Sequence, residues 1–93
     1  MESFTRAQRS VAGNVRRLRL RRGLTQAKLA EAAKLDDTFI QRVERASVNL
    51  SLRALTKIAD ALGVRAVELL RTAEPRVARV GRPKKSRKRT VAR

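Results

Sequence analysis

Side chains that could form hydrogen bonds with nucleic-acid bases are concentrated in residues 37–45, DTFIQRVER. We expect a helix here, with Ile40 facing the core. At 100° per residue, Thr38, Gln41 and Arg42 then face away from that core. Arginine can form paired hydrogen bonds with guanine, glutamine can do so with adenine, and threonine can bond to either. The spacing therefore predicts a helix edge that can read bases in the major groove of DNA.

Two more residues flank this edge. Asp37 could accept a hydrogen bond from the amino group of cytosine or merely repel phosphates, and Phe39 could contact the methyl group of thymine. Because every amphipathic surface helix has a polar edge, this helix alone does not separate a DNA-reading role from an ordinary solvated face. The base-reading candidates are Asp37, Thr38, Phe39, Gln41 and Arg42.

The segment that must position this edge covers residues 25–44 and has the pattern of two short helices joined by a tight turn. Thr25 is the expected N-cap of the first helix, and the carboxylate of Asp36 is expected to cap the second. Small and apolar residues fall where the two helices would cross: Leu29, Ala30, Ala33, Leu35, Ile40 and Val43. This is the pattern of a helix-turn-helix, which places its second helix in the major groove.

The remaining elements are also predicted to be helical. We expect Gly23 to end the first helix, Ser51 to cap the fourth and Gly63 to stop it. Residues 1–9 are polar and are expected to be frayed. The predicted helices cover about residues 10–22, 26–33, 37–45, 52–62 and 66–71. The fold class is therefore all-α, with a helix-turn-helix domain over residues 10–72.

Charge narrows the class of partner. The 93 residues include 24 Lys or Arg and eight Asp or Glu, which gives a net charge of +16. Residues 76–93 hold nine of the basic residues and no acid, so we expect residues 73–93 to form a disordered basic tail. This excess favours double-stranded DNA as the partner. An anionic membrane fits less well, because the tail lacks large apolar anchors.

Composition also argues against other functions. The chain has no Cys and no His, so a His and Cys metal cluster is impossible and no cofactor is expected. No nucleophile, acid–base pair or glycine-rich phosphate loop is recognisable, which argues against an enzyme. No apolar run approaches the roughly 20 residues of a membrane span, and the N-terminus lacks the hydrophobic core of a secretory signal. We expect a cytoplasmic, nucleoid-associated protein.

Two strings carry a family resemblance: VRRLRLRRGLTQAKLAEAA, and FIQRVERASVNLSLRALTKIADALGVRAVELL. They resemble the Cro/CI-type helix-turn-helix family of bacterial and phage regulators, also called the XRE family. TFIQRVER, followed by NLSL and KIADALGV, is most similar to the restriction–modification controller proteins of that family. The resemblance implies a compact, lambda-repressor-like domain of five helices that binds a palindromic operator as a homodimer.

The resemblance also implies roles for single residues. Arg19 and Glu44 match a pair that ties the first helix to the third. Gln26 matches a phosphate contact, as do Asn49 and Ser51 together with the start of the fourth helix. Asp37, Thr38, Gln41 and Arg42 match positions that face the bases, and Phe39 matches an aromatic position of the controller proteins. Independently of the resemblance, an inward-facing carboxylate at Glu44 would need a cationic partner, which favours a structural role for the pair.

Two residues depart from the family pattern. Lys34 and Ala46 stand where glycine is usual. Either Lys34 adopts a left-handed conformation, at about 1 kcal/mol, or the turn has a different shape.

In the tail, GRPKK resembles part of an AT-hook, but Val80 replaces the preceding arginine, so unspecific phosphate contact is the favoured interpretation. Deleting residues 76–93 should then weaken binding and flatten its salt dependence. The phosphate-contact candidates are Thr25, Gln26, Lys34, Arg45, Asn49, Ser51, Arg82, Lys84 and Lys85.

Several alternatives remain open at this point. Val64, Val67 and Leu70 could form a dimer contact or simply close the small core. The chain could be a sequence-specific transcription regulator that also contacts RNA polymerase. It could instead be a nonspecific nucleoid-type or RNA-binding protein, or an antitoxin that binds a cognate toxin and represses its own operon.

Overall fold

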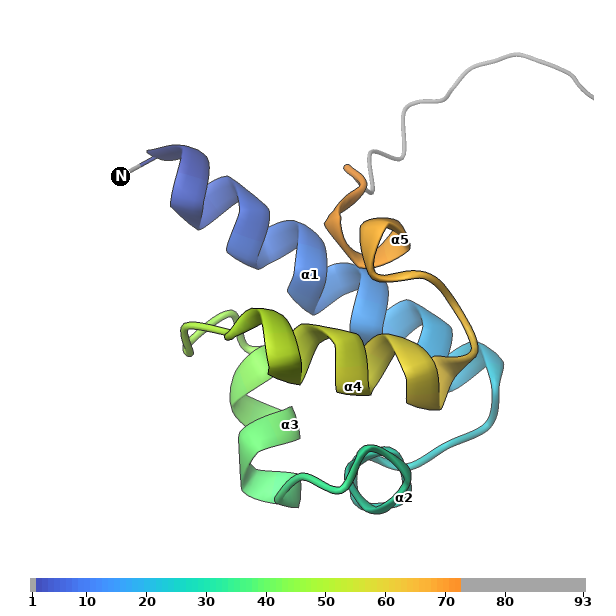
Figure 1. Cartoon of the computed structure of the whole chain (residues 1–93). Coiled ribbons are helices and arrows are strands. Elements are labelled where there is room, and N and C mark those ends of the chain that lie inside the picture. The colour runs from blue at the N-terminus through green and yellow to red at the C-terminus, as the bar shows by residue number, and fades with distance from the viewer. Residues whose placement is uncertain (1, 73–93) are drawn as a thin grey trace, which may run out of the picture.

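The computed structural model describes residues 2–72, which form five α-helices and no strand (Figure 1). The predicted tail, with Arg82, Lys84 and Lys85, lies outside the described residues. The helices are α1 (Glu2–Arg21), α2 (Gln26–Ala33), α3 (Asp37–Glu44), α4 (Leu52–Leu62) and α5 (Ala66–Leu70). In the view of Figure 1, α2 and α3 lie below α4, and α5 lies above it. The all-α fold with five helices is therefore confirmed.

Local capping sets the ends of the short helices where the sequence predicts them. The Thr25 hydroxyl accepts from the backbone N–H of Lys28, and the Ser51 hydroxyl accepts from that of Ala54, both at 3.0 Å. Gly63 ends α4 with φ 73°, a left-handed conformation that glycine adopts without a steric penalty. As a result, α2 and α4 have the predicted bounds, and α3 and α5 end one residue earlier than predicted.

Two local predictions are wrong. The first helix starts at Glu2 rather than at about Ser10, so residues 2–9 are helical and not frayed. The reason is a contact distant in sequence: the Gln8 amide donates to the carbonyl of Val48 at 3.0 Å. Asp36 does precede α3 as its N-cap, but its exposed carboxylate makes no capping hydrogen bond, so only its charge acts on the helix dipole.

The turn between α2 and α3 takes one of the two predicted forms. Lys34 is left-handed, with φ 60° and ψ 48°. The backbone N–H of the next residue, Leu35, donates to the carbonyl of Ala30 at 2.9 Å. Lysine therefore fills a glycine-type helix end, at roughly 1 kcal/mol. Ala46, after α3, is also left-handed, with φ 56°.

The core is aliphatic and draws residues from every helix. Its fully buried side chains include Val15, Leu29, Ile40, Ile58, Leu62 and Leu69. Ile40 and Val43 fix α3 to this core, and Leu29, Ala30 and Ala33 do the same for α2. No helix in residues 2–72 is both long and apolar enough to cross a membrane.

A buried polar residue, Asn14, anchors α5 to α1. Its amide nitrogen donates to the carbonyls of Leu69 at 2.9 Å and Arg71 at 2.8 Å, and its oxygen accepts from Arg17 at 3.1 Å. These bonds satisfy carbonyls at the end of α5, which no later turn of that helix could satisfy. Sequence reasoning missed this role. The signal was a polar residue three positions after Val11 and four before Leu18, on the apolar side of the helix.

Candidate nucleic-acid interface

The outer edge of α3 carries side chains with free polar groups. Asp37, Thr38 and Arg42 are exposed, and their side chains make no hydrogen bond or ion pair within residues 2–72. Directly beneath them, Ile40 is 0% exposed and Val43 only 2%. The helix is thus fixed from one side, while donors and acceptors remain available on the other. Of the remaining base-reading candidates, Gln41 and Phe39 are half-buried, and Phe39 packs against the core.

An ion pair holds the C-terminal end of α3 in place. The Arg19 guanidinium donates from Nε to Glu44 Oε2 at 2.6 Å and from Nη2 to Glu44 Oε1 at 3.0 Å. The side chains of Arg19 and Glu44 are only 8% and 3% exposed. The hydrogen bond to Glu44 raises the pKa of Arg19, against the opposing effect of burial. The pair implied by the family resemblance is therefore present, and it joins α1 to α3.

Gln26, at the start of α2, completes this network. Its amide nitrogen donates to Glu44 Oε1 at 3.1 Å, and Arg19 Nη1 donates to the carbonyl of Leu24 at 2.8 Å. The amide nitrogen of glutamine has two N–H groups, so one of them remains available for a phosphate. The network links α1, α2 and α3 around one carboxylate, and it fixes the start of α2 relative to α3.

The other phosphate candidates within the described part of the chain lie at helix ends and in the connections between helices. Thr25, the N-cap of α2, is exposed. Lys34 lies three positions before the first residue of α3, Arg45 directly follows the helix, and both are exposed. Asn49 and Ser51 are exposed in the connection to α4. The Ser51 hydroxyl already accepts from a backbone N–H of α4, but it keeps its own proton to donate.

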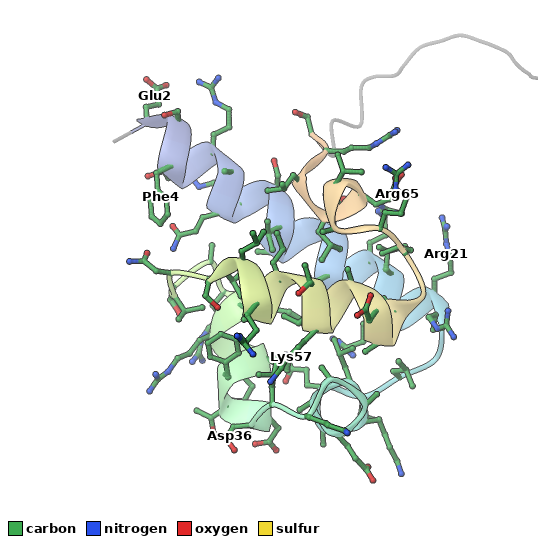
Figure 2. All side chains as sticks on the ribbon, viewed as in Figure 1. Glu2, Phe4, Arg21, Asp36, Lys57 and Arg65 are labelled. Atoms are coloured by element: carbon green, nitrogen blue, oxygen red, sulfur yellow. The ribbon has the colours of Figure 1, made fainter. Side chains whose placement is uncertain are left out.

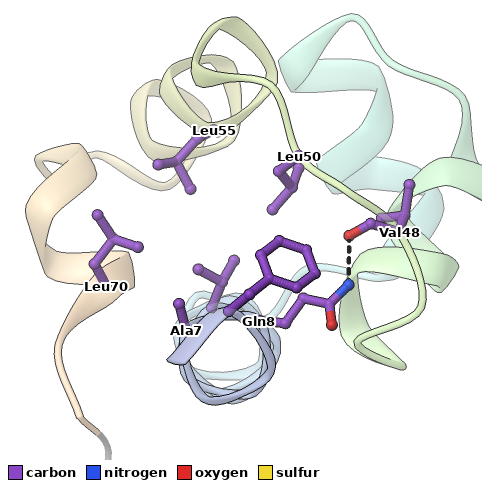
Figure 3. Close-up of a pocket in the computed structure, with 8 residues that line it drawn as sticks. Ala7, Gln8, Val48, Leu50, Leu55 and Leu70 are labelled. Atoms are coloured by element: carbon purple, nitrogen blue, oxygen red, sulfur yellow. Dashed lines mark hydrogen bonds between the residues drawn. The ribbon is translucent and has the colours of Figure 1, made fainter. Parts of the chain in front are cut away.

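The dimer candidates separate into two groups. Val64 is half-buried and packs against the core. By contrast, Val67 is 47% and Leu70 48% exposed. Leu70 also lines an apolar hollow of about 160 Å³, shown in Figure 3. The residues around this hollow are Phe4, Ala7, Gln8, Val11, Val48, Leu50, Leu55 and Leu70.

Comparison with known protein families shows to which family the chain belongs. A helix-turn-helix family model, HTH_3, matches residues 15–69, which is more than half of the chain. The chain belongs to the HTH_3 helix-turn-helix family, the XRE family. Members of this family are transcription regulators and not enzymes, as the sequence predicts.

Individual relatives agree with this assignment. The chain is 42% identical over 60 residues to a hypothetical transcription factor of Neisseria meningitidis serogroup B, strain ATCC BAA-335 / MC58. This match covers 64% of the chain but 57% of that relative's length.

Two solved structures share the fold. The crystal structure of the hypothetical transcription factor NHTF from Neisseria superposes with a TM-score of 0.72 at 37% identity, covering 76% of this chain and 82% of that one. The restriction–modification controller protein C.AhdI from Aeromonas hydrophila gives 0.65 at 35% identity, covering 67% and 94%. A similarity to controller proteins is thus present in sequence and in fold.

Proposed function

We propose that this HTH_3 protein is a sequence-specific regulator that binds double-stranded DNA and reads the major groove with α3. The observation that carries this proposal is the arrangement of α3 itself. Thr38 and Arg42 are exposed and their side chains have no partner within residues 2–72, while Ile40 beneath them is fully buried. A rigidly held helix with free donors and acceptors on one edge is what direct readout of base edges requires.

The proposed contacts divide into two kinds. Thr38, Gln41 and Arg42 would contact base edges, with Asp37 and Phe39 at the flanks. Phosphate contacts would come from the start of α2 and from the residues that border α3, which set orientation without reading sequence. These phosphate residues are Thr25, Gln26, Lys34, Arg45, Asn49 and Ser51.

We further propose that two copies associate through α5 on a palindromic operator. Val67 and Leu70 support this, because each leaves about half of an apolar side chain in solvent. The Leu70 side chain continues into the apolar hollow bordered by Phe4 and Leu50. A twofold dimer would place two copies of α3 in half-sites about one helical turn, 34–36 Å, apart.

Selection of bound duplexes from a random pool tests the proposal. The expected result is one enriched palindrome, bound by the full chain roughly 10³-fold or more above unrelated duplexes. Sedimentation with and without that duplex then tests the dimer. Nearly equal affinity for all duplexes would contradict sequence reading and favour a nonspecific nucleoid-type protein, which would act in the cytoplasm by charge alone.

RNA polymerase is the partner protein that we propose for such a regulator at its operator. The antitoxin, which would bind a cognate toxin and repress its own operon, is an alternative function. Co-purification of a second chain in stoichiometric amount, together with binding to its own promoter, would favour the antitoxin.

A further inference from the structure

The outward side of α1 carries a dense set of exposed arginines. Glu2 is the only acid of this helix. The exposed arginines are Arg6, Arg9, Arg16, Arg17 and Arg21, with Arg22 directly after the helix. At 100° per residue, the five within the helix lie about 100° or more from the buried Val15, so this side is turned away from the core.

Half of these cations are already engaged within the domain. Arg6 pairs with Glu2 at 3.1 Å, Arg17 donates to the side chain of Asn14 at 3.1 Å, and Arg22 donates to the carbonyl of Leu62 at 2.9 Å. Arg9 and Arg16 have no hydrogen bond or ion pair within residues 2–72. Arg21, at the end of the helix, is likewise unpaired within residues 2–72, so Arg9 and Arg16 are the two unpaired cations at the centre of the helix.

The spacing of Arg9 and Arg16 suits an extended polyanion. They are seven positions apart in the helix, so they lie on one side of it and about 10 Å apart along its axis. That length corresponds to about three base-pair steps along the axis of a DNA duplex. Gly13 lies between them, and a Cβ added there would have no atom of residues 2–72 within 4 Å. Position 13 therefore places no side chain between the two arginines.

This surface is distinct from the reading edge of α3. Arg19 on α1 is bonded to Glu44 of α3 from the inner side of the helix, whereas Arg9 and Arg16 lie on the exposed side. Figure 2 shows Glu2 and Arg21 at the two ends of α1, far from Asp36 at the start of α3. A twofold-symmetric contact with a second copy does not suit this surface, because it would bring the same arginines against these.

We propose that the outward side of α1 binds the sugar–phosphate backbone of a second DNA duplex, so that the protein joins two DNA segments. Arginine is suited to this contact, because its guanidinium group matches phosphate geometry with two parallel hydrogen bonds. The contact reads charge and not sequence. It does not depend on whether α3 reads bases, since phosphate binding requires no operator.

A two-duplex capture assay tests the proposal with the full chain. A biotinylated 30-base-pair duplex of arbitrary sequence is immobilised and saturated with protein, and a fluorescent second duplex is then added at low salt. The variants are R9Q/R16Q and, as a control with the same change of charge, R65Q/R71Q, whose side chains are also exposed. The control also removes the exposed ion pair between Arg71 and Glu68, 3.3 Å long, which should contribute little to stability. Thermal unfolding should be unchanged in all three proteins, which shows that any loss of capture is not a loss of folding.

The wild type and R65Q/R71Q should capture the second duplex, and R9Q/R16Q should capture several-fold less while the first duplex is loaded equally. For the second duplex, the slope of log affinity against log salt should be shallower by about two in R9Q/R16Q, one for each arginine. Equal capture by both variants would overturn the proposal. A loss of binding confined to the first duplex would also overturn it, because both arginines would then contact the DNA held by α3. Tighter capture of poly-glutamate than of duplex would overturn it as well, because the arginines would then suit an acidic protein.

Discussion

The outward sides of α1 and α3 both present arginines to solvent, but their surroundings differ. Around α3, Asp36 and Asp37 balance Arg42 and Arg45, and Arg19 neutralises Glu44 in the interior. On α1, one acid accompanies five exposed arginines. Net charge attracts any polyanion, whereas a neutral helix must gain its binding energy from particular hydrogen bonds. The contrast suggests that α3 supplies selectivity and α1 supplies attraction.

The largest expected effect is on stability and concerns the ion pair between Arg19 of α1 and Glu44 of α3. Replacing Glu44 with Ala leaves the Arg19 guanidinium buried without its partner, so we expect a loss of about 3–5 kcal/mol in the free energy of unfolding. Urea denaturation of the full chain measures this. Glu31→Ala is the control, since the Lys28–Glu31 pair is exposed and 3.9 Å long, and it should change stability by less than about 0.5 kcal/mol. Equal effects would show that the Arg19–Glu44 pair does not hold α3.

The next largest effect is on base preference, and it distinguishes the outward side of α3 from that of α1. Arg42→Ala on α3 should lower the preference for one base of the selected duplex by about 1–3 kcal/mol, because a bidentate contact is lost. Arg16→Ala on α1 is the matched control and should leave every base preference unchanged. Competition with singly substituted duplexes measures both. If Arg16→Ala altered a base preference, or Arg42→Ala altered none, the division of roles would be wrong.

The smallest effects come from two glycines. Gly13→Ala should raise stability by about 0.5–1 kcal/mol, since this helix-interior position is open and contacts nothing within 4 Å. Gly63→Ala should lower stability by more than about 1 kcal/mol, because φ is 73° and the new Cβ would lie 2.9 Å from Arg22 Nη1. Thermal unfolding of the two variants shows whether each substitution raises or lowers stability. A destabilised Gly13→Ala would indicate that the outer side of α1 is packed against something.

The parts of this fold that the sequence predicts well depend on neighbours along the chain. Thr25, Ser51 and Gly63 set helix ends through bonds within four residues, and the bounds of α2 and α4 were accordingly correct. The start of α1 was wrong because it depends on Gln8 reaching Val48, forty residues away. Asn14 was missed for the same reason, since its partners are at the far end of the domain.

The candidate site shows a similar division. Helical periodicity was enough to place Thr38 and Arg42 outside and Ile40 inside. It could not show that Gln26 is held by Glu44, because that bond depends on how α2 and α3 cross. The roles of the base-reading and phosphate candidates remain predictions, since contacts with DNA require a duplex.

The central claim, that the outer edge of α3 reads bases, is tested most directly by a ratio of affinities. The full chain is titrated, at one salt concentration, against the selected duplex and a shuffled duplex of the same composition. Our account predicts a preference of roughly 10³-fold or more, which falls sharply in a variant carrying Thr38→Ala, Gln41→Ala and Arg42→Ala. A ratio near one for the wild type, or a ratio that survives the triple substitution, would contradict it.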